Sequence, residues 1–322
     1  MLRRDTHKIK TGLSSVLLLL LILLITGCQA VNKPLVSPTP AFYSFTDSLG
    51  RQITLENRPQ RVAAISGSYA DTWLLAGGEL AATTQDAWDE GNLVLPDNVV
   101  DLGSVKTPSI ETILDNRIDF VLLSSKIAEH MQLLRQLEEL NISCAYFEVE
   151  IFDDYLNMLK ICTDITGRTD LYQKNGTDVQ MQIDAAIARK DGKEAPTVLL
   201  IRAYSTGAQA KNSENMAGTM LKELGCINIA DSNGKLLEDL SMEIILEQNP
   251  DYIFFITMGA SEEKALESMR TTLEKNSAFM GLCAVQNNRY IQLPKALFHL
   301  KPNRRWGESY EFLADILYEK DE

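Results

Sequence analysis

The sequence predicts an α/β protein of two lobes, each built on a central, mostly parallel sheet, with a ligand cleft between the lobes. Three observations support this prediction. Strand-like and helix-like segments alternate over most of the chain, which is typical of doubly wound sheets. A helix-then-strand pattern occurs twice, and a helical stretch without strands separates the two copies. Ligands of such sheets bind at the carboxyl ends of the strands, so loops that follow strands are the candidate ligand contacts.

The repeated pattern occupies residues 109–124, SIETILDNRIDFVLLS, and residues 241–256, SMEIILEQNPDYIFFI. When the copies are aligned without a gap, Ser, Glu, Ile, Leu and Asp coincide, and most other positions exchange similar residues. Each copy has an early glutamate, Glu111 in the first and Glu243 in the second. A chance match is the alternative, but the same helix-then-strand context in both copies favours a true repeat of one unit in each lobe.

The N-terminus has the pattern of an export signal. Basic residues in MLRRDTHKIK precede an apolar run at 16–25, which is too short to span a bilayer of roughly 30 Å. The run ends in ITGC, which resembles a bacterial lipobox. We therefore expect a signal peptide over residues 1–27 and a lipid on Cys28. An uncleaved signal anchor with an incidental cysteine is the alternative.

Residues 28–41 have three prolines and no hydrophobic periodicity, which predicts an extended tether. Beyond this segment the chain has a globular composition, with 45% hydrophobic and 23% charged residues overall. The formal net charge of −13 argues against a nucleic-acid partner. The composition therefore predicts an exported, anchored and folded protein.

The first lobe is expected over residues 42–150. Turn formers at 47–50 separate two β-rich runs and predict a hairpin. Ser68 is the expected N-cap of the first helix, with Asp71 as its capping-box acid, and Pro108 is expected at the first position of the repeat helix. The predicted elements are a hairpin at 42–56, strands at 61–66, 80–88 with its loop, 119–124 and 142–149, and helices at 68–78, 108–117 and 130–141.

A connecting helical segment is expected over residues 151–190, because no strand-like run interrupts it. The second lobe, residues 191–322, then restarts the alternation of strands and helices. Its predicted elements are a strand at 195–204, a helix and link at 218–230, the second repeat copy at 241–256, a strand at 287–293 and a closing helix at 304–320.

Four cysteines follow Cys28, and none forms a CxxC pair, so neither a zinc ribbon nor a redox motif is supported. They are Cys144, Cys162, Cys226 and Cys283. Buried small hydrophobic residues are the favoured interpretation. Disulfides stay open in an exported protein, but the spacing proposes no pairing.

Aromatic and basic residues occur in loops after predicted strands. Tyr69, Trp88 and Tyr204 are candidates to stack on a flat or bulky ligand, although each would also suit the core. Lys106 and Arg202 are candidate charged contacts in such loops. Trp73, inside a predicted helix, is expected in the core.

The most unusual stretch is IQLPKALFHLKPNRRWG, residues 291–307, because it is basic within an acidic chain. It holds Lys295, His299, Lys301, Arg304 and Arg305 without one acid. Some of these side chains would pair with an anionic ligand in the cleft. A solvated basic loop is the alternative. Beyond the signal segment the chain has only His130 and His299, which is too few for a typical site that binds a bare metal ion, so no metal site is expected.

Several stretches, in this order, resemble ABC-importer substrate-binding proteins of the class for ferric siderophores, haem and cobalamin. They are FTDSLGRQITLENRPQRVAAIS, SIETILDNRIDFVLL, LKELGCINIA, SMEIILEQNPDYIFF and AVQNNRYIQLP. The resemblance covers essentially the whole mature chain. It implies two Rossmann-like lobes joined by a long helix, with the ligand held between them and modest closure on binding.

The resemblance also implies partners. A lipoprotein of this class lies on the outer face of the bacterial cell membrane and delivers its ligand to a permease dimer with ATPase subunits. A glutamate on each lobe meets arginines of the permease, and the matching positions are Glu111 and Glu243. One acid per lobe suits a two-fold symmetric partner. The alternative is that both acids only stabilise helix N-termini. Asp71 is a third candidate surface acid, but its capping-box role is preferred.

The function favoured by these observations is capture of a ferric-siderophore-type iron complex, without catalysis and without a resident cofactor. Cobalamin or haem would fit the same architecture. An enzyme, or a surface interaction protein unrelated to transport, is the alternative from another class. The sequence has no GxSxG motif, no phosphate-binding loop of the GxxxxGK[ST] type and no dinucleotide fingerprint, which argues against common enzyme classes.

Overall fold

The computed structural model describes residues 41–89, 93–259 and 261–318. The chain divides into two compact units, residues 1–40 and 41–322, and all described residues belong to the second unit. The expected signal peptide, Cys28 and nearly all of the expected tether lie outside the described residues. The following description concerns the second unit alone.

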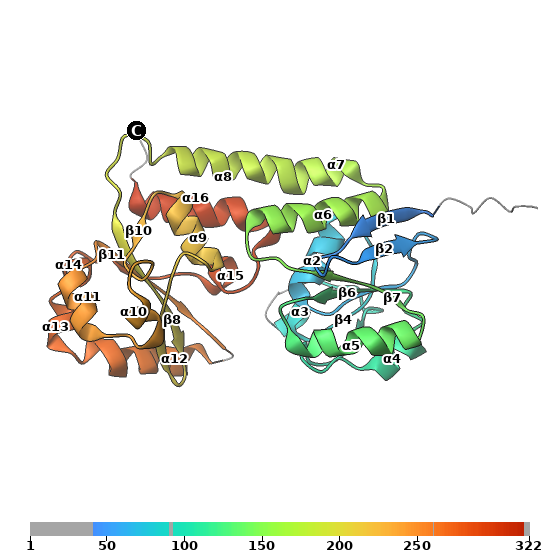
Figure 1. The fold of residues 1–322 in the computed structure, drawn as a ribbon, viewed down its shortest axis with the longest axis horizontal. Coiled ribbons are helices and arrows are strands. Elements are labelled where there is room, and N and C mark those ends of the chain that lie inside the picture. The colour runs from blue at the N-terminus through green and yellow to red at the C-terminus, as the bar shows by residue number, and fades with distance from the viewer. Residues whose placement is uncertain (1–40, 90–92, 260, 319–322) are drawn as a thin grey trace, which may run out of the picture. The chain divides into compact units, whose positions relative to one another are not determined.

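The first sheet is fully parallel, with the strand order β5-β4-β3-β6-β7, and three of its strands, β4, β6 and β7, are labelled in Figure 1. Its central strands consist of small and branched apolar residues that are buried on both faces, as expected when helices cover a sheet from both sides. The strands are β3 (Val62–Ala64), β4 (Leu80–Thr83), β5 (Val100–Asp101), β6 (Phe120–Ser124) and β7 (Ser143–Phe147).

The second sheet is mostly parallel, with the order β10-β8-β11-β12, and β9 pairs antiparallel with β8. The strands are β8 (Thr197–Tyr204), β9 (Gly207–Lys211), β10 (Ile227–Asn228), β11 (Tyr252–Thr257) and β12 (Tyr290–Gln292). The two central sheets confirm the predicted α/β class. The antiparallel β9 was not predicted, because its sequence GAQAK has little β-propensity.

The two copies of the repeat occupy equivalent places. Helix α4 (Ile110–Asp115) leads into β6, which lies beside β3 in the first sheet. Helix α11 (Met242–Gln248) leads into β11, which lies beside β8 in the second sheet. β3 and β8 are the first strands of their sheets along the chain. The repeat therefore corresponds to one structural unit that is present in both sheets.

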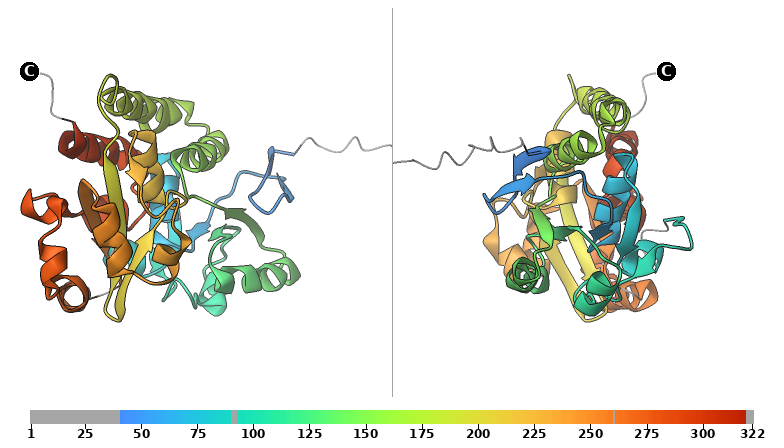
Figure 2. Two further views of the ribbon diagram at one scale, coloured as in Figure 1. Left: turned by 60° about the vertical axis from the view of Figure 1, so that its left-hand side comes forward. Right: turned by 90° about the vertical axis from the view of Figure 1, so that its right-hand side faces the viewer.

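A layer of long helices spans both sheets. In Figures 1 and 2, α7 and α8 run along one side of the unit, with α6 packed beside α7 and α16 packed beside α8. The helices are α6 (Phe152–Thr166), α7 (Thr169–Tyr172), the π-helical turn η1 (Gln173–Thr177), α8 (Asp178–Ala188) and α16 (Trp306–Leu317). Helices α7 to α8 continue one another and form the connection between the sheets.

Shorter helices complete the unit. They are α2 (Gly67–Leu75), α3 (Asp86–Asp89), α5 (Ala128–Glu139), α9 (Met216–Glu223), α10 (Gly234–Glu238), α12 (Glu262–Met269), η2 (Arg270–Glu274), α13 (Ser277–Met280), α14 (Cys283–Gln286), α15 (Lys295–Phe298) and the 3-10 turn η3 (Asn303–Arg305).

One hydrophobic core joins the two sheets. Alternate residues of β6 and β11, such as Leu122 and Phe254, face this shared core, together with residues of α6, α8 and α16. The remaining faces of the sheets have separate cores, in which Val121 and Ile253 lie. Because the shared core is continuous through both sheets, the layer of long helices fixes one sheet to the other.

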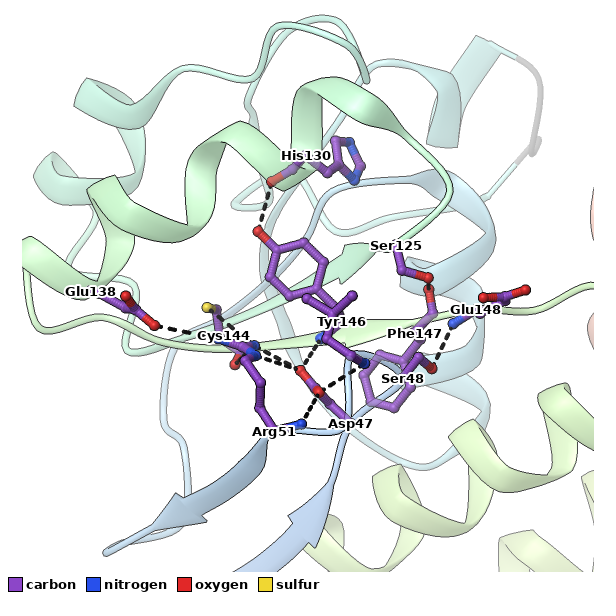
Figure 3. A network of polar contacts seen from close by, with 11 residues as sticks. Asp47, Ser48, Arg51, Ser125, His130, Glu138, Cys144, Tyr146, Phe147 and Glu148 are labelled. Carbon is purple, nitrogen blue, oxygen red and sulfur yellow. Dashed lines mark hydrogen bonds and ion pairs between the residues drawn. The ribbon is translucent and has the colours of Figure 1, made fainter.

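The N-terminal hairpin, β1 (Tyr43–Thr46) and β2 (Gln52–Leu55), is fastened to the first sheet by a buried carboxylate. Asp47 is 5% exposed and accepts two hydrogen bonds from the Arg51 guanidinium, at 3.0 and 2.7 Å, and one from the Tyr146 backbone N–H at 3.2 Å (Figure 3). Arg51 also donates to the Cys144 carbonyl at 3.1 Å. The predicted turn at 47–50 thus also ties the hairpin to β7.

Two predicted helix starts are wrong. Ser66, not Ser68, caps α2, since its hydroxyl accepts from the Tyr69 N–H at 3.3 Å. The start is fixed at Gly67, where an added Cβ would lie 2.7 Å from the Ala87 backbone and the N–H donates to Asp86 at 2.8 Å. Ser109 caps α4, so Pro108 precedes the cap instead of opening the helix.

Two further assignments change. Asp71 is not a capping-box acid, because its carboxylate accepts a hydrogen bond from Asn303 at 2.8 Å. Trp88 lies in the short helix α3 and not in a loop. The cysteine interpretation holds for Cys144, Cys162 and Cys226, which are buried and free, whereas Cys283 is free but exposed. Trp73 lies in the core, as predicted.

Candidate functional site

A cavity of about 290 Å³ lies where the strands of the first sheet end. Its lining comes from the carboxyl ends of the five strands β3 to β7 and the segments that follow them on one side, and from residues 299–301, after α15, on the other. The lining residues are Ser66, Ser68, Tyr69, Asp86, Val105, Ser124, Lys126, Ile127, Val149, Glu150, His299, Leu300 and Lys301. The carboxyl ends of strands in an open α/β sheet are where ligands bind, so this cavity is the candidate site.

The wall formed by the first sheet is held by hydrogen bonds. The Tyr69 hydroxyl donates to the Phe147 carbonyl at 2.8 Å, and burial raises the pKa of Tyr69. Lys126 pairs with Glu148 at 2.6 Å (Nζ to Oε1). Tyr69 thus presents a fixed aromatic body to the cavity, while the charge of Lys126 is already matched.

His130 positions two loops of this wall. Its Nδ1 accepts from the Ser124 N–H at 3.0 Å, so Nε2 carries the proton and donates to the Val105 carbonyl at 2.7 Å. Burial lowers the pKa of His130, which keeps the ring neutral. The ring is fully buried, so His130 supports the cavity and does not face a ligand.

The opposite wall is cationic. Arg202, near the end of β8, acts electrostatically on both His299 and Lys301. Burial, with the charges of Lys295 and Arg202, lowers the pKa of His299 to about 4. Burial is also the main cause that lowers the pKa of Lys301, and Arg202 adds to it. His299 is therefore neutral at pH 7, and this wall concentrates positive charge.

The Arg202 guanidinium has a hydrogen-bond donor without a partner among the described residues. Its Nε is buried and has no hydrogen-bond partner among the residues that the structure describes. On β8, Arg202 lies on the same face as Leu200, which belongs to the shared core, at the end where the strand approaches the cavity. A buried donor without a partner is costly, and an anionic ligand that reached it would remove that cost.

One ion pair joins the two walls. The Glu150 Oε2 and Lys301 Nζ atoms lie 3.5 Å apart. A smaller cavity of about 110 Å³ adjoins this region and shares Ser68, Leu300 and Lys301 with the first. In it, Asn303 donates to the Ser68 carbonyl and to Asp71, both at 2.8 Å. The α2 end of the first wall and the segment before α16 are therefore tied together.

The ligand-binding candidates predicted from the sequence fall into four groups. Tyr69, His299 and Lys301 line the main cavity, Arg202 adjoins it, and Arg305 lines the smaller cavity. Arg305 is also paired with Glu308 at 2.7 Å. The others, Trp88, Lys106, Tyr204 and Arg304, are not among the lining residues, and Trp88 packs on the shared core.

Two cavity acids were not singled out from the sequence. Glu150 follows the predicted strand 142–149 directly, which was the available signal. Asp86 was hidden because its carboxylate serves the backbone, accepting from the Gly67 N–H at 2.8 Å and from the Thr84 hydroxyl at 2.5 Å.

Glu111 and Glu243 are both exposed, in the first turns of the equivalent helices α4 and α11. Ser109 caps α4 through its side chain, whereas Ser241 makes no side-chain cap bond in α11. An exposed leucine follows each glutamate by one helical turn: Leu114 is 43% exposed and Leu246 is 36% exposed. Neither glutamate is buried in its own lobe.

Within the described residues, no group of three or more His, Cys, Asp or Glu side chains is placed to hold a metal ion. The same part of the chain contains no helix with the length and apolar character needed to cross a membrane.

Comparison with known proteins identifies the family. The family model for periplasmic binding proteins matches residues 62–297. The chain belongs to the periplasmic binding protein family. This family comprises extracytoplasmic binding proteins that are not enzymes and that work with the permease and ATPase components of ABC transporters, which confirms the recognised family and the non-enzymatic expectation. No curated protein sequence matches the chain significantly.

Solved structures of periplasmic binding proteins share the fold. An ABC transporter substrate-binding protein from Listeria monocytogenes EGD-e aligns with a TM-score of 0.66 at 19% identity, over 82% of this chain and 100% of that chain. IsdE of S. aureus, complexed with heme, gives 0.66 at 16%, over 81% and 99%. The iron-uptake ABC transporter protein PiuA of Streptococcus pneumoniae Canada MDR_19A gives 0.68 at 17%, over 87% and 98%.

Proposed function

We propose that this periplasmic binding protein captures an anionic iron complex of the ferric-siderophore type for an ABC importer. The observation that carries the proposal is the cationic wall of the cavity, where Lys301 lies opposite the strand ends of the first sheet and Arg202 is close enough to act on its charge. The buried Nε of Arg202 adds a donor that an acidic or catecholate oxygen would satisfy.

The similar structures support the iron assignment only as analogies. IsdE was crystallised with heme, and PiuA is described as an iron-uptake protein. Haem carries two carboxylates, so it would also suit a cationic wall. Cobalamin contains no iron and has no carboxylates, because neutral amides make up most of its periphery. The charge of the wall therefore favours an acidic iron complex over cobalamin.

Binding is tested by titrating the protein with a ferric hydroxamate, a ferric tris-catecholate, haem and cobalamin, and following tryptophan fluorescence. We expect quenching by the ferric tris-catecholate or haem, and weakening of that binding at high salt because charged groups contribute. Tight binding of cobalamin alone would overturn the iron assignment.

We further propose that Glu111 and Glu243 dock the protein on its permease dimer. The two acids are exposed on equivalent helices, and each has an exposed leucine one turn later, so the same small patch is present in both halves. Each subunit of a permease dimer would contact one of the two patches of this protein. Arginines of the permease would then pair with Glu111 and Glu243 at the rims of the patches.

Docking is tested by the ATPase activity of the permease complex in vesicles. Glu111→Arg and Glu243→Arg should each reduce its stimulation, and the double variant should reduce it most. Glu263→Arg is the matched control, because Glu263 is also an exposed acid in the first turn of a helix but lies outside the repeat. Full stimulation by the double variant would contradict the docking assignment.

Membrane attachment through Cys28, after removal of residues 1–27, is proposed on the signal pattern alone, since these residues lie outside the described part of the chain. Cells that express the protein would be labelled with radioactive palmitate and fractionated. We expect label in the wild-type protein and none in Cys28→Ser. Equal labelling of both proteins would exclude lipidation at this residue.

A further inference from the structure

One acidic side chain reaches across the candidate site. Glu150 follows β7 of the first sheet, Lys301 follows α15, and both line the main cavity. Their carboxylate and ammonium groups lie 3.5 Å apart, with 40% of the Glu150 side chain and 27% of the Lys301 side chain exposed. Within the part of the chain that the structure describes, this pair therefore links the two walls of the cavity by charge.

The surroundings of Lys301 are rich in positive charge. The charge of Arg202 opposes that of Lys301, while Glu150 is the largest favourable influence on the Lys301 ammonium and Asp154 a smaller one. Arg202 also opposes the charges of Lys211 and His299. Glu150 thus occupies the position beside Lys301 that an acidic group of a ligand would need.

The backbone of Glu150 is held by shorter hydrogen bonds than its side chain is. The Asp154 carboxylate accepts the backbone N–H of Glu150 at 2.9 Å and that of Ile151 at 3.0 Å, which holds the start of α6. Among the described residues, the Glu150 carboxylate forms one ion pair, the 3.5 Å contact with Lys301, and the charge of Lys126 also attracts it. The neighbouring Lys126–Glu148 pair is shorter, at 2.6 Å. Partly exposed pairs of this kind contribute little to stability, so a ligand can replace Glu150 at small cost.

We propose that Glu150 is an internal competitor for the anion-binding group of the cavity. Its carboxylate pairs with Lys301 while no ligand is bound, and an acidic group of the incoming complex displaces it. This inference rests on the proposed function and adds its regulation. The competition lowers affinity, because an acidic group of the ligand must first displace Glu150 from Lys301.

The test compares wild type, Glu150→Gln, Lys301→Met and the double variant, using calorimetric titration with a ferric tris-catecholate and NMR titration with citrate. A competitor predicts that Glu150→Gln binds both probes about two- to fivefold more tightly. Lys301→Met should bind them about tenfold more weakly. In the Lys301→Met background, the benefit of Glu150→Gln should disappear, because both residues act on the same interaction.

Asp153→Asn is the matched control, because it removes the same charge from an exposed position in the first turn of α6. We expect it to change affinity less than Glu150→Gln does. Equal gains in both variants would show a general charge effect and would overturn the proposal, as would weaker binding by Glu150→Gln, which would make Glu150 a direct ligand contact. Thermal melting of each variant checks that it folds.

The two probes separate this inference from the proposed function. Failure of the iron complex to bind, with the expected citrate pattern, would remove the iron assignment but keep the competition. Binding of the iron complex with the same affinity for wild type and Glu150→Gln would keep the iron assignment and remove the competition.

Discussion

The two repeated units of this protein are alike on the outside and different on the inside. On the outside, α4 and α11 each present an exposed glutamate followed by an exposed leucine. On the inside, β6 ends at a wall whose Lys126 is already paired with Glu148. Near the carboxyl end of β8, beside β11, Arg202 lies with an unsatisfied buried Nε.

This difference separates two kinds of recognition. A partner made of two equal subunits needs two equal patches, and repetition of one unit supplies them. A single ligand between the halves meets two different walls, so the cavity residues of the two copies are free to differ. We infer that similarity between the copies marks the proposed docking surface and that dissimilarity marks the ligand site.

The largest effect is expected on ligand affinity, from substitutions in the two walls of the cavity. Arg202→Met should weaken binding of a ferric tris-catecholate by about tenfold or more, because a buried charged donor is lost. Lys126→Met, on the other wall, should change affinity by less than about threefold, since Glu148 already pairs with that lysine. Calorimetric titration measures both. Equal losses would show that the two walls contribute alike and would break the comparison.

The second effect concerns the pH dependence of stability, which should differ between His299, in the cationic wall, and His130, which supports the opposite wall. His299 has a pKa of about 4 in the folded protein, below its usual 6.5, because burial and the charges of Lys295 and Arg202 disfavour the proton. The unfolded chain therefore binds the proton first, so His299 makes stability fall as pH decreases from about 6.5 to 4. After allowance for partial exposure, the loss is about 1–2 kcal/mol.

Denaturant unfolding of wild type and His299→Gln at pH 7.5 and pH 5 measures this loss of stability. The variant should lose less stability between the two pH values than the wild type does. His130→Gln is the comparison from the first wall, where it should destabilise at both pH values because two hydrogen bonds are lost. Identical pH dependence of wild type and His299→Gln would exclude His299 as the titrating group.

A third effect distinguishes the repeat helices themselves. Ser109→Ala should destabilise the protein by about 1 kcal/mol, because the Ser109 side chain caps α4. Ser241→Ala should have almost no effect, because Ser241 makes no side-chain cap bond. Urea unfolding at pH 7.5 compares the two. A loss of stability in Ser241→Ala equal to that in Ser109→Ala would show that both copies cap their helices in the same way.

The smallest effect is expected on the docking patches. Leu114→Asp and Leu246→Asp should each reduce stimulation of the permease ATPase about twofold to threefold, because each adds a charge where the docking proposal places an apolar side chain against the partner. The two reductions should be similar. If only one variant reduced stimulation, the patches would not be equivalent and the two-fold docking proposal would need to be revised.

Much of the fold could be predicted from local patterns. Buried runs such as Phe120–Ser124 and Tyr252–Thr257 have a length and an apolar composition that indicate strands, and the repeat places them in equivalent positions. Helix starts were less predictable. Ser66 and Ser68 both suit an N-cap, and the choice depends on Gly67, whose close contact with Ala87 comes from a different part of the chain.

The candidate site was predicted only in part for the same reason. The basic stretch at 291–307 was visible, and it supplied His299 and Lys301 to the cavity. Sequence alone could not show that Arg304 would stay exposed or that Glu150 would reach Lys301. These outcomes depend on how the segment before α16 lies against the first sheet.

The shared core has a consequence for how this chain is made. Its residues run from Phe45 to Tyr318, and Trp306, at the start of the last helix, packs on Phe152 with ring centroids 6.0 Å apart. A polypeptide that emerges from a ribosome or a translocation channel with its N-terminus first cannot complete this core until α16 has followed. Until then, the apolar surfaces of α6 and α8 lack their last partner. The final dozen or so residues of the fold thus decide when the whole molecule becomes resistant to proteases, and truncation there would expose the centre of the protein and not merely its end.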